Sequence, residues 1–136
     1  MTPARTVLLP LLLAAGGAVA QESDLAAAGA QLFHDHCAAC HGLDARGAGP
    51  MRPILNVPAP DLTRLAMDRG GFPHLDVARK IDGRDPLMSH GSDMPVWGPY
   101  FDGPEAAFVF PEPGQPIATS GPVAALITYL ESIQQP

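Results

Sequence analysis

The nine residues HDHCAACHG, at positions 34–42, constrain this chain more than any other stretch. They contain Cys37 and Cys40, which are the only cysteines of the chain, and three of its five histidines. The two thiols stand three positions apart, and the imidazole of His41 follows at once. An interpretation of the stretch therefore has to account for both thiols and the adjacent imidazole together.

The pattern C-x-x-C-H formed by Cys37, Cys40 and His41 predicts covalent attachment of one haem c. Two thiols at this spacing can add to the two vinyl groups on one edge of a porphyrin. The imidazole that follows is then held beneath the iron as a ligand. Covalent linkage also retains a large apolar cofactor in a domain too small to bury it completely. This interpretation gives all three residues a role and leaves no thiol to mispair after export.

Three other kinds of site use closely spaced cysteines. A thioredoxin-like redox pair normally follows a strand in a βαβ unit, and no such pattern surrounds this stretch. A zinc site needs four ligands, for which Cys37, Cys40, His34 and His36 are a formal possibility. A structural disulfide suits an exported protein, but it would close a very small loop and leave His41 without a role.

The first 20 residues, MTPARTVLLPLLLAAGGAVA, are typical of a signal peptide. Arg5 precedes a short apolar run that ends in the small-x-small sequence Ala18-Val19-Ala20. The run is short for a membrane-spanning helix. We therefore expect cleavage after Ala20, export to the periplasm, and a mature chain of residues 21–136 that forms one domain without a membrane span.

The expected mature chain is strongly acidic. Removal of Arg5 leaves seven of the eight basic residues against 14 acidic ones, so the formal net charge is −7 with neutral histidines. A charge of this sign disfavours binding to nucleic acid and attracts protein partners with basic surfaces.

Residues 23–41 are predicted to form the first helix, with Ser23 or Asp24 as its cap. Gly29 lies on the apolar face of this helix. Glycine is unfavourable inside a helix by about 1 kcal/mol relative to alanine, so we expect it to permit the close approach of another backbone.

The second predicted helix begins at Pro122, a residue that suits a first helical turn. Its apolar positions follow the helical period at Val123, Leu126, Ile127, Leu130 and Ile133. We expect this helix to cross the first one near Gly29 and Phe33, with Tyr129 at the contact.

The middle of the chain is predicted to consist mostly of loops, because most of the 16 prolines and 14 glycines lie between residues 42 and 122. A short helix is expected over residues 73–82. The stretch AAFVF, at residues 106–110, is either a short strand or a helical turn, and the sequence does not decide between them. No alternation is strong enough to predict a sheet.

A second ligand to the haem iron is sought in the stretch MSHGSDMPVWG, at residues 88–98. Met94 is favoured because Pro95 stiffens the chain beside it and Trp97 supplies an apolar wall. Met88 and His90 are the rivals in the same stretch. His74 is a more distant candidate, and Met51 and Met67 are interpreted as packing residues.

These motifs together resemble the small monohaem c-type cytochromes of class I. The resemblance rests on GxxLFxxHCxxCHG at residues 29–42, GxGP at 47–50, PDLT at 60–63, MPVWG at 94–98 and the last helix. It implies an all-α fold in which crossing terminal helices and long loops enclose one haem held by Cys37, Cys40, His41 and Met94. The segment from Phe101 to Thr119 departs from the simplest members, as a docking insertion or as a solvated loop.

The resemblance also assigns further residues to the haem site. Pro50 is the expected proline whose carbonyl accepts a hydrogen bond from the second ring nitrogen of His41, with Pro53 as an alternative. Arg84 and Trp97 are expected to reach the haem propionates, with a solvated Arg84 as the alternative.

The resemblance implies a periplasmic one-electron carrier and not an enzyme, acting either as a free shuttle or as the cytochrome subunit of a dehydrogenase. With His41 and Met94 bound, the iron has no open position for a substrate. The alternative is a five-coordinate haem enzyme or gas sensor in which Met94 is not bound and His90 is the nearby distal base.

Overall fold

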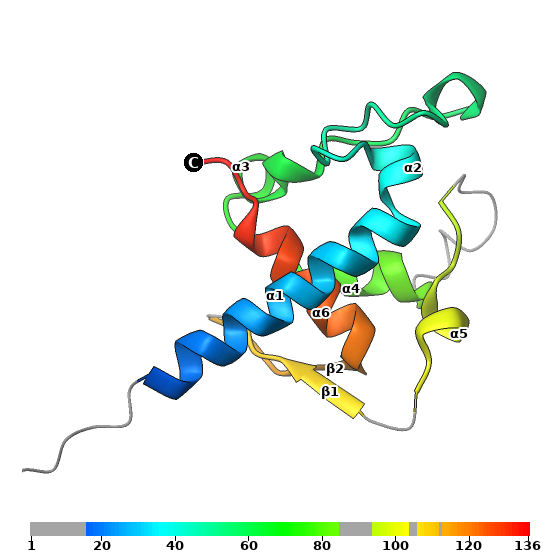
Figure 1. Cartoon of the computed structure of the whole chain (residues 1–136). Helices are drawn as coiled ribbons and strands as arrows, with labels where there is room; N and C mark the ends of the chain where they lie inside the picture. The colour runs from blue at the N-terminus through cyan, green and yellow to red at the C-terminus, as the bar shows by residue number, and fades with distance from the viewer. Residues whose placement is uncertain (1–15, 85–93, 104–105, 112) are drawn as a thin grey trace, which may run out of the picture.

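The computed structural model describes residues 16–84, 94–103, 106–111 and 113–136, with side chains from residue 21 onward (Figure 1). Its elements, in chain order, are the helices and strands α1 (Gly16–His36), α2 (Ala38–His41), the 3₁₀ turns η1 (Arg52–Ile54) and η2 (Leu62–Arg64), α3 (Leu65–Arg69), α4 (His74–Asp82), α5 (Gly98–Phe101), β1 (Ala106–Val109), β2 (Ile117–Ser120) and α6 (Gly121–Ser132).

The crossing of α1 over α6 is the central packing contact of the fold (Figure 1). A Cβ atom added to Gly29 would lie 2.0 Å from the carbonyl oxygen of Ala125, so only glycine fits at the crossing. One turn further along α1, the ring of Phe33 contacts that of Tyr129 with centroids 5.4 Å apart. The predicted crossing at Gly29 and Phe33 is confirmed.

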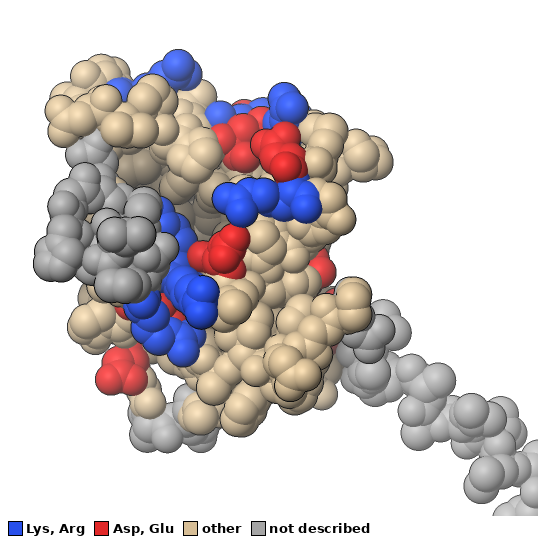
Figure 2. Space-filling view, turned by 180° about the vertical axis from the view of Figure 1, so that it is seen from behind, with Lys and Arg blue, Asp and Glu red and all other residues tan. Residues whose placement is uncertain are grey.

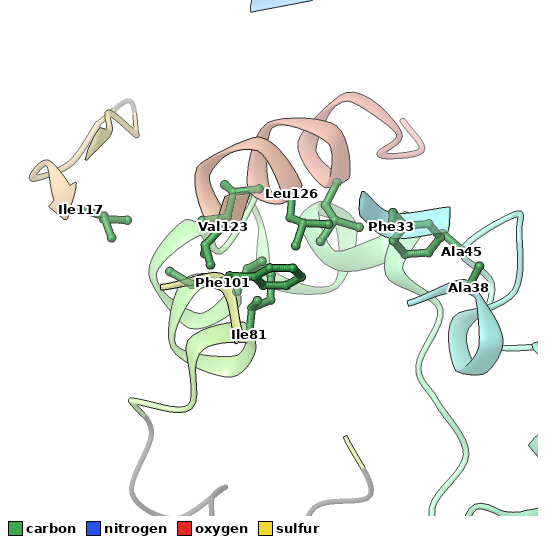
Figure 3. Packing of buried hydrophobic residues seen from close by; sticks show 12 residues of the cluster. Phe33, Ala38, Ala45, Ile81, Phe101, Ile117, Val123 and Leu126 are labelled. Carbon is green, nitrogen blue, oxygen red and sulfur yellow. The ribbon is translucent and has the colours of Figure 1, made fainter. Parts of the chain in front are cut away.

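The apolar side chains of α6 form the largest part of the hydrophobic core. Val123, Leu126 and Ile127 are fully buried, and Figure 3 shows the first two facing Phe101 and Ile81 from α5 and α4. Figure 3 also shows the second end of the cluster, where Phe33 of α1 lies toward Ala38 and Ala45. The core therefore joins the helix pair to the segment that carries the two cysteines.

The first helix differs from its predicted bounds at both ends. It begins at Gly16, so Ser23 and Asp24 lie inside it and do not cap it. It also runs through the expected cleavage position after Ala20. At its other end it stops at His36, and after Cys37 the chain resumes as the single turn α2.

The all-α expectation is corrected by a small antiparallel sheet. β1 pairs with β2, with Ala106 opposite Ser120 and Val109 opposite Ile117. Ile117 is buried in the core, which anchors the pair. The stretch AAFVF is thus a strand over its first four residues, and the fold is mostly helical rather than purely helical.

The remaining elements lie in the loop-rich middle of the chain. The helix expected over residues 73–82 is confirmed as α4, which packs against α5 and α6. Within the part of the chain that the structure describes, no helix has the length and apolar character needed to cross a bilayer.

Candidate functional site

The segment that carries the two cysteines is a bend between two helical pieces. The Cys37 amide still donates to the Phe33 carbonyl oxygen at 2.8 Å, which continues the pattern of α1. The Cys37 carbonyl oxygen then accepts from the amides of Cys40, at 3.1 Å, and of His41, at 2.9 Å. Both thiols are free and half-buried, one turn apart. This turn presents two thiols and an imidazole from a single short piece of backbone.

His41 is the buried member of the group, with only 8% of its surface exposed. Its Nδ1 atom lies 3.3 Å from the carbonyl oxygen of Pro60, which suits an Nδ1–H donor. Burial lowers the pKa of His41, and the Pro60 carbonyl opposes that shift. The imidazole is therefore neutral at neutral pH, and Nε2 is the nitrogen with a lone pair for a metal.

The expected carbonyl partner of His41, Pro50, is replaced by Pro60 in the structure. The residues beside Pro50 bond instead to the backbone of the cysteine turn: the Gly49 amide donates to the Cys40 carbonyl oxygen at 3.1 Å, and the Met51 amide donates to the Ala39 carbonyl oxygen at 2.9 Å. Pro50 is thereby held against the backbone of α2, and its side chain is exposed. Pro53, the alternative, lies in η1 and is also exposed.

Glycines in the following loop bring Pro60 back to the imidazole. A Cβ atom at Gly47 would lie 2.1 Å from the carbonyl oxygen of Ala59, and Gly47 has a positive φ of 78°. The Gly47 amide also donates to the His41 carbonyl oxygen at 2.7 Å. The chain thus returns across Gly47 so closely that residues 59 and 60 lie beside the end of α2.

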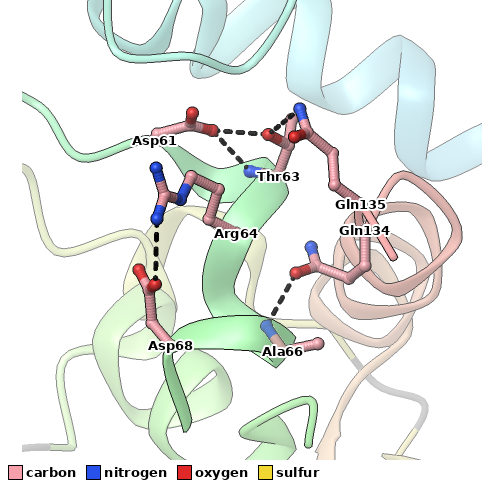
Figure 4. A network of polar contacts seen from close by, with 7 residues as sticks. All are labelled: Asp61, Thr63, Arg64, Ala66, Asp68, Gln134 and Gln135. Atoms are coloured by element: carbon pink, nitrogen blue, oxygen red, sulfur yellow. Dashed lines mark hydrogen bonds and ion pairs between the residues drawn. The ribbon is translucent and has the colours of Figure 1, made fainter. Parts of the chain in front are cut away.

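A polar network fixes the segment that follows Pro60 (Figure 4). The Asp61 carboxylate accepts from the Thr63 amide at 2.9 Å and from the Thr63 hydroxyl at 2.6 Å, and these bonds lower the pKa of Asp61. Thr63 Oγ1 also accepts from Nε2 of Gln135 at 2.9 Å. Gln134 accepts from the Ala66 amide at 2.8 Å and donates to the Leu62 carbonyl oxygen at 2.8 Å. The chain after α6 therefore clamps the segment that supplies the carbonyl to His41.

The structure does not support the zinc interpretation. Among the described residues, no three His, Cys, Asp or Glu side chains lie close enough together to hold a metal ion. His34 is exposed and contacts Asp35, whereas the ring of His36 lies among aromatic side chains. Burial raises the pKa of Cys37 to about 11, with a smaller contribution from Cys40, so this thiol is protonated at neutral pH. A protonated thiol is a poor redox nucleophile.

The remaining residues considered for the haem site lie in the 88–98 stretch or before it in the sequence. Met94 is half-buried and packs against the hydrophobic core, and Trp97 stacks on Phe101 with centroids 5.5 Å apart. Met88 and His90 lie outside the described residues. Arg84 is exposed: its guanidinium pairs with Asp82 and donates to the carbonyl oxygen of Ala118 at 3.1 Å. His74 instead pairs with Glu131 of α6 at 2.9 Å.

Five residues of this site were not predicted as functional from the sequence: Pro60, Asp61, Thr63, Gln134 and Gln135. The first three belong to the quoted motif PDLT, which was a usable signal. The side chains of the two glutamines bond to residues 68 to 72 positions away, and nothing in their local sequence indicates this.

The donor set fits a covalently bound haem. Two free thiols lie one turn apart, and beside them a neutral imidazole has one nitrogen turned to a carbonyl and the other left for iron. The thioether of Met94 is half-buried. These are the ligand types found on c-type haem iron.

Comparison with known proteins supports the same conclusion. Residues 26–134 match the family model described as Cytochrome c. Searches of curated proteins and of solved structures find no significant match to the chain. Because the matched range covers most of the sequence, the chain belongs to the cytochrome c family.

Proposed function

We propose that residues 21–136 form a periplasmic one-electron carrier with a single haem c, attached through Cys37 and Cys40 and bound by His41 and Met94. The family membership supports haem-based electron transfer as the general activity. The observation that carries the specific proposal is the buried, neutral imidazole of His41 with its Nδ1 atom turned to the carbonyl of Pro60. When bound, the haem supplies an iron that changes between the ferrous and ferric states by one electron.

His41 acts as the fixed ligand in this proposal. The Pro60 carbonyl holds the tautomer in which Nε2 is unprotonated, and a hydrogen bond of this kind raises the donor strength of the imidazole. The Asp61, Thr63 and Gln135 bonds keep the carbonyl in place, so the ring stays oriented while the iron changes its charge.

Met94 acts as the second ligand. Its thioether is a neutral, soft donor that favours ferrous over ferric iron and so raises the reduction potential. With His41 and Met94 both holding the iron, no position would remain open for a substrate. Met94 is therefore the residue that separates an electron carrier from the alternative, a five-coordinate enzyme or gas sensor.

The last part of the proposal concerns the export of the protein and the redox partners that it meets. Residues 1–20 act as a cleaved signal peptide, and haem is attached after export. The excess of acidic residues favours a redox partner with a basic surface. The carrier acts as a free shuttle or as the cytochrome subunit of a dehydrogenase, and co-purification of the exported protein from its source distinguishes the two.

Two measurements on the purified, exported protein test the proposal. Haem should remain with the polypeptide after extraction with acidified acetone, because thioether bonds survive this treatment. The reduced protein should not bind carbon monoxide at neutral pH, because Met94 occupies the sixth position. Extractable haem would refute covalent attachment, and stoichiometric binding of carbon monoxide would favour the five-coordinate alternative.

A further inference from the structure

A cluster of aromatic rings lies at the end of α1, beside the cysteine turn. The ring of His36 contacts Tyr100, Trp97 and Phe101, with centroids 5.1, 5.4 and 5.4 Å away. Trp97 also contacts Tyr100 with centroids 5.7 Å apart. Phe101 is buried in the core and anchors the cluster to it. The other rings are thus held in fixed positions by a rigid part of the fold.

The cluster joins the two segments that carry the proposed haem ligands and attachments. His36 directly precedes Cys37, and Trp97 follows Met94 by three residues. The Trp97 amide donates to the Ile81 carbonyl oxygen at 2.9 Å, which fixes the start of α5 against α4. The ring cluster therefore lies beside Cys37, where an electron would enter or leave the proposed haem.

Part of the cluster faces solvent. Tyr100 is 65% exposed and Val96 is 43% exposed, and Pro99 is also exposed. Aromatic side chains with an apolar body and a polar tip are enriched in protein interfaces, where they supply most of the binding energy. We call the surface of His36, Val96, Trp97, Pro99, Tyr100 and Asp102 the aromatic face.

The charged residues are unevenly distributed along the chain. The segments that form the aromatic face contain Asp and Glu but no Lys or Arg. Residues 21–45 contain four acidic residues and no Lys or Arg, and residues 85–136 contain six acidic residues and no Lys or Arg. Asp102 directly follows α5, and Asp35 precedes His36 and interacts with it electrostatically. A partner that approaches the aromatic face therefore meets negative charge.

All seven Lys and Arg residues of the mature chain lie between residues 46 and 84. In the rear view of Figure 2, Lys and Arg side chains gather on one face next to Asp and Glu side chains. Arg64 pairs with Asp68, and Arg69 pairs with Asp76. Arg84, which follows the α4 helix packed on α5, is paired with Asp82. Arg64, Arg69 and Arg84 are thus compensated by neighbouring carboxylates.

We propose that the aromatic face is the docking surface for a redox protein whose own contact surface is apolar and rimmed by basic residues. The proposal rests on the proposed function and adds to it the place and chemistry of the contact. Acidic side chains draw the partner in from a distance, and the exposed ring of Tyr100 and the half-buried ring of Trp97 bind it beside Cys37. Transfer moves one electron from ferrous iron to the oxidised partner, and no proton or other group moves with it.

The test uses tris(1,10-phenanthroline)cobalt(III), a cation with aromatic ligands, in place of the basic and apolar contact surface. It oxidises the reduced protein by taking one electron. We expect this rate to fall with rising salt and to fall several-fold in Tyr100→Ala and in Asp102→Lys. Ferricyanide, an anion, is the parallel oxidant: its rate should be retained in Tyr100→Ala and should rise in Asp102→Lys.

Matched variants control for the loss of an exposed ring and for the change of charge. Phe108→Ala removes a ring that is 55% exposed on β1, and Asp24→Lys makes the same charge change near the start of the mature chain. Both should keep the cobalt rate of the unmodified protein. If either control slows the reaction as much as Tyr100→Ala and Asp102→Lys do, the docking surface is not the aromatic face.

A binding measurement without turnover uses the oxidised protein, with which the cobalt complex does not react. The chain has a single tryptophan, so Trp97 gives the only indole N–H signal in a nuclear magnetic resonance spectrum. This signal should shift as the complex is added, and it should shift less in Tyr100→Ala. An unchanged signal would overturn the proposed face. Loss of oxidation by both reagents would instead refute the electron-carrier function itself.

Discussion

The imidazole of His41 and the carbonyl oxygen of Pro60 lie 3.3 Å apart, although 19 positions separate the two residues in the sequence. The contact depends on bonds made still further along the chain, because Gln135 donates to Thr63 and Thr63 donates to Asp61. The orientation of the proposed iron ligand is therefore set by residues that never touch it.

Replacement of Thr63 by valine should loosen this arrangement. Thr63 is 5% exposed, and the substitution removes the hydroxyl with which Asp61 and Gln135 form hydrogen bonds. Removal of one partner of a buried hydrogen bond costs about 1–3 kcal/mol, so Thr63→Val should lower the free energy of unfolding by this amount in guanidinium titrations. A weaker Pro60 contact also makes His41 a poorer donor, so the reduction potential should rise.

The control for Thr63→Val is Thr128→Val. Thr128 donates its hydroxyl only within α6, to the carbonyl oxygen of Ala124 at 3.1 Å. This variant should lose less stability and should keep the reduction potential of the unmodified protein. Equal shifts in potential for the two variants would show that the Thr63 network does not position His41.

The Asp61 carboxylate should contribute to the stability of the protein against acid. Hydrogen bonds from Thr63 lower its pKa in the folded state below the ordinary value of 3.8. A group with a lowered pKa stabilises the fold above its unfolded pKa, and this contribution is lost as the pH falls through the folded value. Unfolding followed by circular dichroism should therefore show a smaller loss of stability below pH 3.8 in Asp61→Asn than in the unmodified protein.

An exposed aspartate of α1 serves as the comparison for Asp61. Asp24→Asn should keep the acid dependence of the unmodified protein, because Asp24 is exposed and is not a member of the Thr63 network. The same acid profile for Asp61→Asn and the unmodified protein would contradict the proposed contribution of Asp61.

Alanine at Gly29 should separate the two main helices. Its Cβ would overlap the backbone of Ala125 and would lie 2.8 Å from Cβ of Tyr129, so α1 has to move away from α6. Overpacking of this kind costs about 1–3 kcal/mol, which a shift in the denaturation midpoint measures. Gly121→Ala, at the start of α6 where an added Cβ meets nothing within 4 Å, should be neutral or slightly stabilising.

The two cysteines should each account for one bond to the haem. Cys37→Ser and Cys40→Ser should leave one thioether each, and the double variant should leave none. Mass spectrometry of the intact, denatured polypeptide distinguishes the three outcomes. Covalent haem on the double variant after export would show that the attachment site lies elsewhere.

Met94 should determine the coordination and the potential of the iron. The ferric protein should show the weak charge-transfer band of a sulfur ligand, and Met94→Ala should abolish it and open the iron to carbon monoxide in the reduced state. Met94→His should restore two axial ligands at a lower potential, because a second imidazole favours ferrous iron less than a thioether does. Met88→Ala and His90→Ala should keep the band. Its loss in Met88→Ala and retention in Met94→Ala would reassign the ligand to Met88.

The helical framework was predictable because its signals are local. A glycine on the apolar face of an alanine-rich helix indicated a close crossing, and Gly29 packs directly on Ala125. The sheet was not predictable in the same way. β1 has only four residues, and its pairing with β2 depends on the burial of Ile117 in a core built from distant helices.

The site was predictable as far as side chains define it. Cys37, Cys40 and His41 form a motif with fixed spacing, and the structure places them on one turn. The partner of His41 is a backbone carbonyl, which any residue carries, and prolines at 50, 53, 58 and 60 are available in the same loop. The choice among them depends on the path of the chain through Gly47, which the sequence does not encode locally.

The dependence of the cysteine turn on residues as late as Gln135 also has a consequence for the order of events during export. Helix α6 and the clamp from Gln134 and Gln135 emerge long after Cys37 and Cys40, and contacts between such distant segments form late in folding. In the proposed export, both thiols would be open to solvent until α1 packs against α6. Thioether formation would then take place on the chain before α6 docks and Cys37 becomes half-buried.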